Sequence, residues 1–200
     1  NPNFQILILN YPDDVHHTAV HPSFPYPNCV FYQANTTGNS ARAGFYPDLF
    51  GTPNVYLNGE KADGGSTLIS QGMLEDALGQ TSPLQVTVSE TDNGSSRDVE
   101  VNVISAEAPP AGNLRLFVVV AEQIVEQTTG NGESEHHNVF RRFLTPTDGV
   151  AITPAAAGGS VNATYSFDLD ASWEADEIYV LAFVQDVDSR EVINSGTRFD

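Results

Sequence analysis

The chain of 200 residues has little cysteine and little positive charge. Cys29 is its only cysteine, so neither an intrachain disulfide nor a CxxC redox pair can form within it. The eight basic residues, of which only Lys61 is a lysine, stand against 26 acidic ones, which gives a formal net charge of −18. So negative a chain repels phosphate backbones and anionic membrane surfaces, and we therefore expect no nucleic-acid partner.

Long apolar runs and hydrolase motifs are also missing. No apolar run approaches the ~20 residues that span a bilayer, so we expect no membrane span. The sequence has no G-x-S-x-G motif around a nucleophilic serine and no thiol pair, so we expect that the protein is not an enzyme. Because the chain begins with Asn1 and not Met, we expect that a leader was removed or that the sequence is part of a longer gene product.

The first part of the chain carries both strand and helix signals. The apolar run FQILILNY at 4–11 predicts a buried strand. Residues 12–37 are rich in proline, histidine and aromatic residues and predict a long irregular segment. A short helix is expected over 39–46, capped by Asn39 or Ser40.

The stretch GTPNVYLNGE predicts a corner of the fold. Pro53 cannot donate a backbone hydrogen bond, so it suits the first residue of a strand that continues over Asn54–Leu57. The Asn58-Gly59 dipeptide predicts a hairpin turn into a second short strand near 60–62. Such a strand resembles the substrate-facing corner of the thioredoxin fold, which implies a cis Thr52–Pro53 bond and makes Pro53 a marker of the fold.

The remaining chain shows a helix signal and then a period of two. A helix that begins near Ser66 or Ser70 is expected to end at Leu78. The net charge is −2 over residues 1–59 and −13 over 83–200, which supports a domain boundary near residue 82. The second part predicts an immunoglobulin-like antiparallel sandwich, interrupted by a long excursion at 124–147. Its strand signals lie at 84–88, 99–103, 114–123, 149–153, 161–169, 177–186 and 191–195.

Two stretches carry a family resemblance. NGESEHHNVFRR at 131–142 and IYVLAFVQDVDSREVINSG at 178–196 resemble the outer membrane protein 28 related family of secreted and surface bacterial proteins. The resemblance implies a thioredoxin-like domain over 1–82 and an Ig-like sandwich over 83–200, outside the cytoplasm. The first strand, the CxxC turn and the first long helix of a thioredoxin-like domain are absent from this sequence. We expect such an incomplete α/β domain to leave an apolar face uncovered.

Clustered histidines suggest one metal site. A zinc ion could be held by His16 or His17 together with His21 and a carboxylate from Asp13 or Asp14. The alternative is that these imidazoles only satisfy backbone groups in long loops. The adjacent pair at 136–137 is a poor chelator by itself, because neighbouring side chains in a strand point to opposite faces.

Alternating acidic residues suggest a possible calcium site and no other cofactor. Ca²⁺ takes six to eight oxygen ligands, and two acidic runs offer such oxygens at alternate positions. The alternative is a solvated acidic face. The candidate ligands are Asp168, Asp170, Asp186, Asp188 and Glu191.

The leading functional hypothesis is a non-catalytic structural protein, extracellular or on the bacterial cell surface, that self-associates into an oligomer, filament or tube. One alternative is a surface module that binds glycan or peptide. Another is a thioredoxin-like oxidoreductase whose CxxC segment lies upstream of Asn1. The aromatic residues expected to make the self-association contacts are Phe24, Tyr26, Phe31, Tyr32, Phe45, Tyr46 and Phe50.

Overall fold

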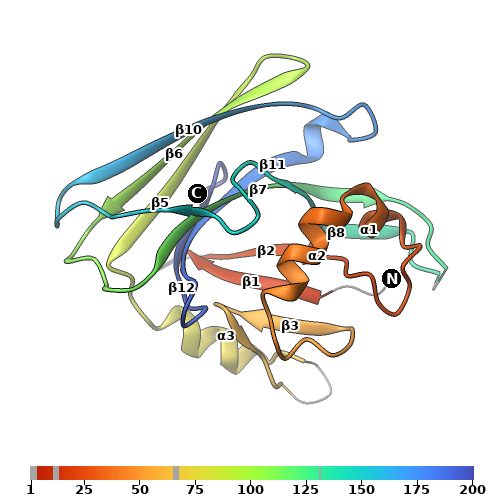
Figure 1. Cartoon of the computed structure of the whole chain (residues 1–200), viewed down its shortest axis with the longest axis horizontal. Coiled ribbons are helices and arrows are strands. Elements are labelled where there is room, and N and C mark those ends of the chain that lie inside the picture. Colours follow the sequence, from red (N-terminus) through yellow and green to blue (C-terminus); the bar gives the residue numbers. More distant parts are fainter. Residues whose placement is uncertain (1–3, 11–13, 65–67, 131) are drawn as a thin grey trace.

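The computed structural model describes residues 4–10, 14–64, 68–130 and 132–200, which form a mostly β structure with a few short helices (Figure 1). The helices are α1 (Val30–Ala34), α2 (Thr36–Gly44) and α3 (Gln71–Leu78), with a 3₁₀ turn at Ala175–Glu177. The strands of the first part are β1 (Phe4–Asn10), β2 (Asp14–Val20), β3 (Asn54–Leu57) and β4 (Glu60–Lys61). Those of the second part are β5 (Leu84–Asp92), β6 (Ser96–Ser105), β7 (Leu114–Glu126), β8 (Glu135–Phe143), β9 (Val150–Ala151), β10 (Ser160–Asp168), β11 (Ile178–Asp186) and β12 (Val192–Thr197).

The strands form two sheets. A nine-stranded sheet has the order β12-β11-β7-β8-β2-β1-β3-β4, with β9 paired to β7, and a three-stranded sheet has the order β10-β6-β5. The larger sheet crosses the boundary predicted near residue 82, because β2 pairs in parallel with β8 through Ala19 and Val139. Strands from both parts of the chain therefore share one sheet, and residues far apart in sequence meet where β2 and β8 join.

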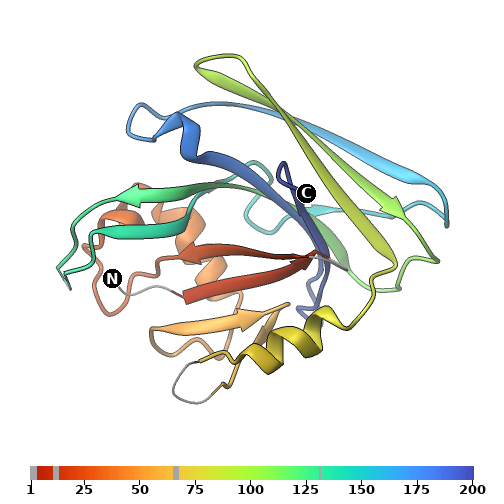
Figure 2. The ribbon, with the colours of Figure 1, turned by 180° about the vertical axis from the view of Figure 1, so that it is seen from behind.

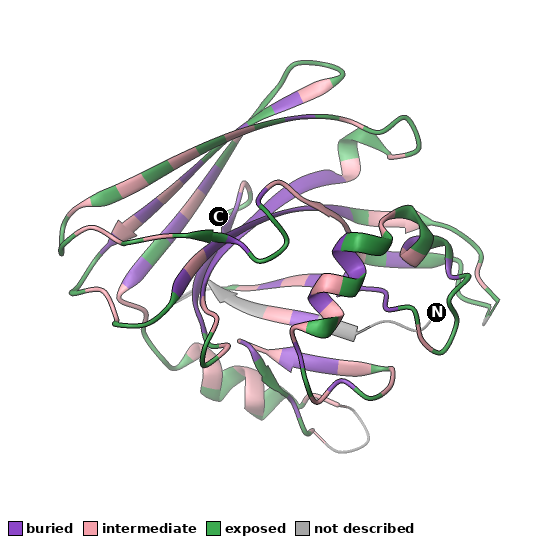
Figure 3. Ribbon diagram, in the orientation of Figure 1, coloured by how far each residue is buried: buried purple, intermediate pink, exposed green. Residues whose placement is uncertain are grey.

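One hydrophobic core lies between the two sheets. Alternate side chains of β7, at Leu116, Val118 and Val120, pack in this core together with β5, β6 and β11. The intervening residues Phe117 and Val119 pack in a second core on the opposite face of the strand. The strand signal at 114–123 thus corresponds to a strand that is apolar on both faces for much of its length, and Figure 3 shows β7 and β11 buried along most of their length.

The second core joins the large sheet to the segment around α2. Ile6, Val20 and Tyr56 from β1, β2 and β3 pack here with Tyr46 and Leu49. Because side chains alternate along a strand, the neighbours of these three strand residues point to the other face of the sheet. Seen from behind, β1 and β2 lie in front of α2 (Figure 2). The face away from α2 is where the candidate site lies.

The segment predicted to be irregular and the predicted excursion both contain a strand. The first part of 12–37 contains β2, whose register along β1 runs from Asp14 opposite Asn10 to Val20 opposite Phe4. The excursion at 124–147 is a hairpin, because β7 continues to Glu126 and pairs with β8. Both strands were missed because polar residues occupy many of their positions.

Some of the predicted helix caps and turns are confirmed, and others are wrong. The predicted caps of the first helix are wrong, because α2 begins earlier and the Asn35 side chain accepts a hydrogen bond from Gly38 N at 2.9 Å. Ser70 caps α3 as predicted, while Ser66 lies outside the described residues. The Asn58-Gly59 turn has φ values of 51° and 95°, and the Thr52–Pro53 bond is cis as predicted.

Candidate functional site

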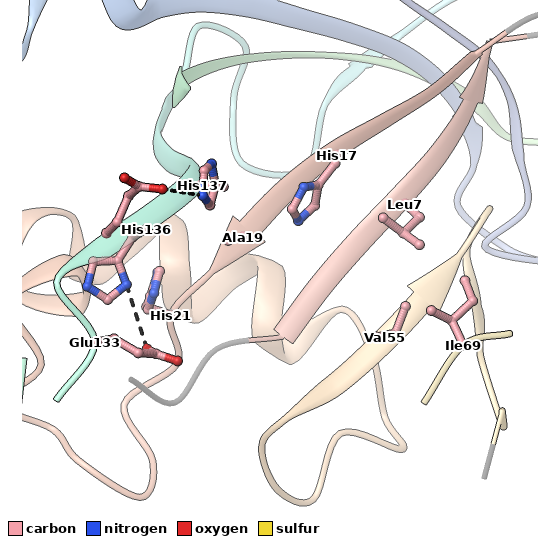
Figure 4. A pocket seen from close by; sticks show the side chains of 10 residues that line it. Leu7, His17, Ala19, His21, Val55, Ile69, Glu133, His136 and His137 are labelled. Atoms are coloured by element: carbon pink, nitrogen blue, oxygen red, sulfur yellow. Dashed lines mark ion pairs between the residues drawn. The ribbon is translucent and has the colours of Figure 1, made fainter. Parts of the chain in front are cut away.

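An open cavity of about 360 Å³ lies on the face of the large sheet that α2 does not cover (Figure 4). Strand alternation places His17 and Ala19 on this face, and His21 follows directly after β2. The first residues of β8 and the loop before it supply the opposite wall. Four histidines and two glutamates are among its lining residues, which are Leu7, His17, Ala19, His21, Val55, Ile69, Glu133, Glu135, His136 and His137.

His21 is the most unusual side chain of the cavity. It is fully buried, and neither ring nitrogen has a hydrogen-bond partner among the residues that the structure describes. Its backbone N donates to Asn39 Oδ1 at 2.9 Å, and its ring packs against Phe31 with 4.7 Å between centroids. Burial, helped by the nearby His136, lowers the pKa of His21 from 6.5 to about 3. The imidazole is therefore neutral at physiological pH, with one lone pair available.

His136 is held in one orientation beside it. Its Nε2 lies 2.9 Å from Gln127 O, and because a carbonyl oxygen can only accept, Nε2 carries the proton. In the neutral ring this leaves the lone pair on Nδ1, which lies 3.8 Å from Oε2 of Glu133. The ring also contacts Phe31 edge-on, with 4.8 Å between centroids, so one phenylalanine positions both buried imidazoles.

His17 and His137 lie further along the same face. His17 Nδ1 accepts from Asn138 Nδ2 at 2.9 Å, while Tyr179 OH donates to Asn138 Oδ1 at 2.9 Å. Burial, together with the neighbouring His137, lowers the pKa of His17 from 6.5 to about 4. His137 is half-exposed, and its Nε2 lies 2.8 Å from Glu135 Oε1.

The two histidines that the sequence offered as alternative zinc ligands, His16 and His17, lie on opposite faces of β2. His16 points to the opposite face from His17, where its Nδ1 lies 2.9 Å from Ser195 Oγ and its Nε2 lies 2.8 Å from Asp200 Oδ1. Within the described chain, Asp14, His16 and Asp200 are the one group of three donors whose ligand atoms lie within 4.8 Å of one another. The other proposed carboxylate, Asp13, lies outside the described residues.

Glu133 was not considered as a candidate ligand on sequence grounds, and the pair His136–His137 was set aside as a poor chelator by itself. The sequence displays them in one short stretch, but it carries no signal that β8 lies beside β2.

Two of the acidic calcium candidates, Asp186 and Asp170, already accept hydrogen bonds within the protein. Asp186 Oδ1 accepts from the backbone N of Asn113 at 3.2 Å and of Asp188 at 3.1 Å. Asp170 Oδ1 accepts from both the backbone N and the hydroxyl of Ser172. Within the described chain, the candidates Asp168, Asp170, Asp186, Asp188 and Glu191 do not form a three-donor group of the kind found around His16.

The aromatic residues expected at a self-association surface are divided between core and surface. Phe31 and Tyr46 are buried and belong to hydrophobic clusters, so their assignment to the surface is corrected. Phe24, Tyr32 and Phe45 are partly buried against these clusters. Only Tyr26 and Phe50 are largely exposed, at 63% and 88% of their surfaces.

Comparison with known proteins places the chain in a family. The family model described as outer membrane protein Omp28 matches residues 44–197, which include both stretches that carried the resemblance. The chain belongs to the Omp28 family. The family description agrees with the expected placement at the bacterial cell surface. No curated protein matches this Omp28-family sequence.

Two solved structures from Porphyromonas gingivalis are similar to this Omp28-family chain. HBP35 is 16% identical, with a TM-score of 0.65 over 98% of this chain and 74% of its own, which shows a shared fold. A domain of the outer membrane lipoprotein Omp28 is 15% identical, with a TM-score of 0.44 over 59% of this chain and 88% of its own. None of the helices in the described residues has the length and apolar character needed to cross a bilayer.

Proposed function

We propose that this Omp28-family chain is a non-catalytic binding protein of the bacterial cell surface or extracellular space, and that its ligand binds in the histidine-lined cavity. The observation that carries the proposal is His21, a fully buried imidazole at an open cavity with both nitrogens unbonded among the described residues. Buried polar groups in native proteins are nearly always hydrogen-bonded, and an exception calls for an explanation. A ligand that bonds to this imidazole is such an explanation.

The proposal includes an assignment of the two parts of the chain. The first part is a thioredoxin-like unit, and the second is an Ig-like sandwich. The parallel pair β1–β3, the hairpin strand β4 and helix α2 on one face support the first assignment. The cavity lies on the opposite face of this unit from α2.

A catalytic role has little support from the two groups best suited to nucleophilic chemistry. Cys29 is 8% exposed and packs with Phe31 and Val139. The Ser195 hydroxyl is hydrogen-bonded to His16, but Ser195 is fully buried, so a substrate could not reach this hydroxyl. A general base activates a nucleophile only where substrate can approach it. We therefore assign the cavity to binding.

The proposal can be tested by filling the cavity. Ile69 is a half-buried lining residue, and Ile69→Trp adds bulk without removing any imidazole. Thermal unfolding of both proteins would be followed with divalent metal ions, oligosaccharides and peptides. A true ligand binds the native state and raises the melting temperature of the parent chain, by several degrees at a hundredfold excess over its Kd. We expect the Ile69→Trp protein to lose this shift.

Val150→Trp is the matched control, because Val150 is exposed on β9 and does not line the cavity. This variant should keep the parent's response. If no ligand class stabilises the parent, or if Ile69→Trp responds as the parent does, the cavity is not the binding site.

Self-association remains a second candidate. Tyr26 and Phe50 present large apolar rings to solvent, which favours burial against another molecule of the same chain or another surface. Both belong to the part of the chain before residue 82, and neither lines the histidine cavity.

A further inference from the structure

Building on the proposed function, we infer that the ligand of the cavity is a divalent transition-metal ion, Zn²⁺ in the first place, bound by His21, His136 and Glu133. Two imidazoles and one carboxylate form a donor set that zinc accepts, with a fourth position left for water or for a group on a partner. The buried His21 is neutral, and a neutral imidazole is the form that binds metal. The ring of His136 is fixed by its hydrogen bond to Gln127 O.

The surroundings of His136 match those of a metal ligand. Metal-bound histidines usually donate their second ring N–H to a carbonyl or carboxylate, which fixes the ring and the tautomer. Gln127 O accepts from Nε2 at 2.9 Å and so directs the Nδ1 lone pair toward Glu133. The 3.8 Å between Nδ1 and Oε2 exceeds a hydrogen bond, and it compares with roughly 3.3 Å between two ligand atoms around tetrahedral zinc.

His21 supplies the second imidazole. Its ring packs against Phe31, which also contacts the His136 ring. His21 is close enough to His136 for the charge of the His136 ring to lower the pKa of His21. The three donor groups are not all within 4.8 Å of one another, so the ion would draw them together. The Glu133 side chain is half-exposed, and no hydrogen bond within the described residues holds the His21 ring.

The group formed by Asp14, His16 and Asp200 is a weaker candidate although its donors are closer. Both nitrogens of His16 already have partners, in Ser195 and Asp200. Asp14 is exposed, and its Oδ1 accepts from Val15 N. This group is therefore complete as a hydrogen-bond network, whereas the His21 ring is not.

Metal binding to the full chain, stripped with a chelator, tests the inference. Zn²⁺ affinity would be measured by competition with a chromophoric chelator, and Co²⁺ would report tetrahedral coordination through its visible absorption. Loss of an outer-shell partner alone typically costs 10–100-fold in metal affinity, so loss of a direct ligand should cost at least about 100-fold. We expect this loss for His21→Phe, His136→Gln and Glu133→Gln.

Glu133→Gln is the decisive variant. Glu133 is half-exposed, so this change should leave the fold intact even if a buried histidine variant fails to fold, and circular dichroism would verify it. The matched control, Asp14→Asn, removes a donor from the other group. It should keep Zn²⁺ affinity within about threefold of the parent, since Asp14 does not line the cavity.

Three results would overturn the inference: no Zn²⁺ binding by the parent, full affinity in Glu133→Gln, or loss of binding in Asp14→Asn. Failure of the metal inference can be distinguished from failure of the proposed function. If Zn²⁺ does not bind but an oligosaccharide or peptide stabilises the parent and not Ile69→Trp, the cavity is a binding site for a different ligand class.

Discussion

Arg42 shows how a single charged residue is accommodated in the core. Its guanidinium lies between 4.7 and 5.4 Å from the ring centroids of Phe45, Tyr46, Phe117 and Phe183. It donates to Gln185 Oε1 at 3.0 Å and to Tyr46 OH at 2.7 Å. Burial lowers the pKa of Arg42 while the Tyr46 hydroxyl opposes that effect. Ring faces and neutral acceptors thus take the place of water around a buried cation.

We predict that Arg42→Lys lowers the free energy of unfolding by about 2–4 kcal/mol, because an ammonium cannot reach both acceptors and stack on the planar rings. Denaturant unfolding would measure this. The matched control is Arg115→Lys, since Arg115 is partly exposed and pairs with the exposed Asp148. It should change stability by less than ~1 kcal/mol. Equal effects in the two variants would show that the aromatic cage contributes little.

At the scale of elements, a strand in which apolar and polar side chains alternate was predicted, and a strand without this alternation was missed. β10 has polar residues at every second position, and its pattern predicted the strand. β2 reads DVHHTAV, and its buried face toward the second core includes His16 and Thr18. A hydrophobicity pattern cannot identify a face that is buried through hydrogen bonds, so the strand was read as a loop.

The turn between β3 and β4 is an element that the sequence predicted well. Asn58 N donates to Leu7 O at 2.8 Å, and Asn58 O accepts from Val192 N at 3.1 Å, so the turn is packed between β1 and β12. A β-carbon added at Gly59, where φ is +95°, would lie 1.8 Å from Arg190 O. Glycine is therefore required here by backbone conformation and by space.

We predict that Gly59→Ala destabilises the fold by about 3 kcal/mol or more, because the strained φ and the clash with backbone add together. Gly94→Ala is the matched control. Gly94 has φ +84° in the β5–β6 turn, but its added β-carbon would meet no atom within 4 Å. It should lose only about 1–2 kcal/mol, the cost of the conformation alone. Chemical denaturation of both variants measures the difference, and equal losses would rule out the clash.

At the scale of the whole molecule, the candidate site arises from one long-range pairing. His21 and His136 stand 115 positions apart, and β2 and β8 come together through the single pair Ala19–Val139. The sequence displays each histidine cluster, yet nothing in residues 14–21 identifies their strand partner. The zinc site predicted from the sequence, with His16 or His17, His21 and Asp13 or Asp14, therefore drew every donor from one segment of the chain.

The net charge of −18 bears on whether copies of the chain associate. Two such molecules repel at low ionic strength, and the Debye length falls from about 10 Å at 0.1 M salt to about 3 Å at 1 M. If Tyr26 and Phe50 form a contact surface, association should therefore increase with salt, since their burial is apolar and is not screened. The prediction is a shift from monomer toward larger species between 0.05 and 1 M NaCl at high protein concentration.

Sedimentation equilibrium measures that shift. Phe50→Ser and Tyr26→Ser should each weaken association by about tenfold or more, because an aromatic ring buried at an interface contributes at least ~1.4 kcal/mol. Val150→Ser removes an exposed apolar side chain at a different position, on β9, and should associate as the parent does. A parent that stays monomeric at every salt concentration would leave these two rings without a role in self-association. Equal weakening by Val150→Ser would instead indicate contact through general surface hydrophobicity.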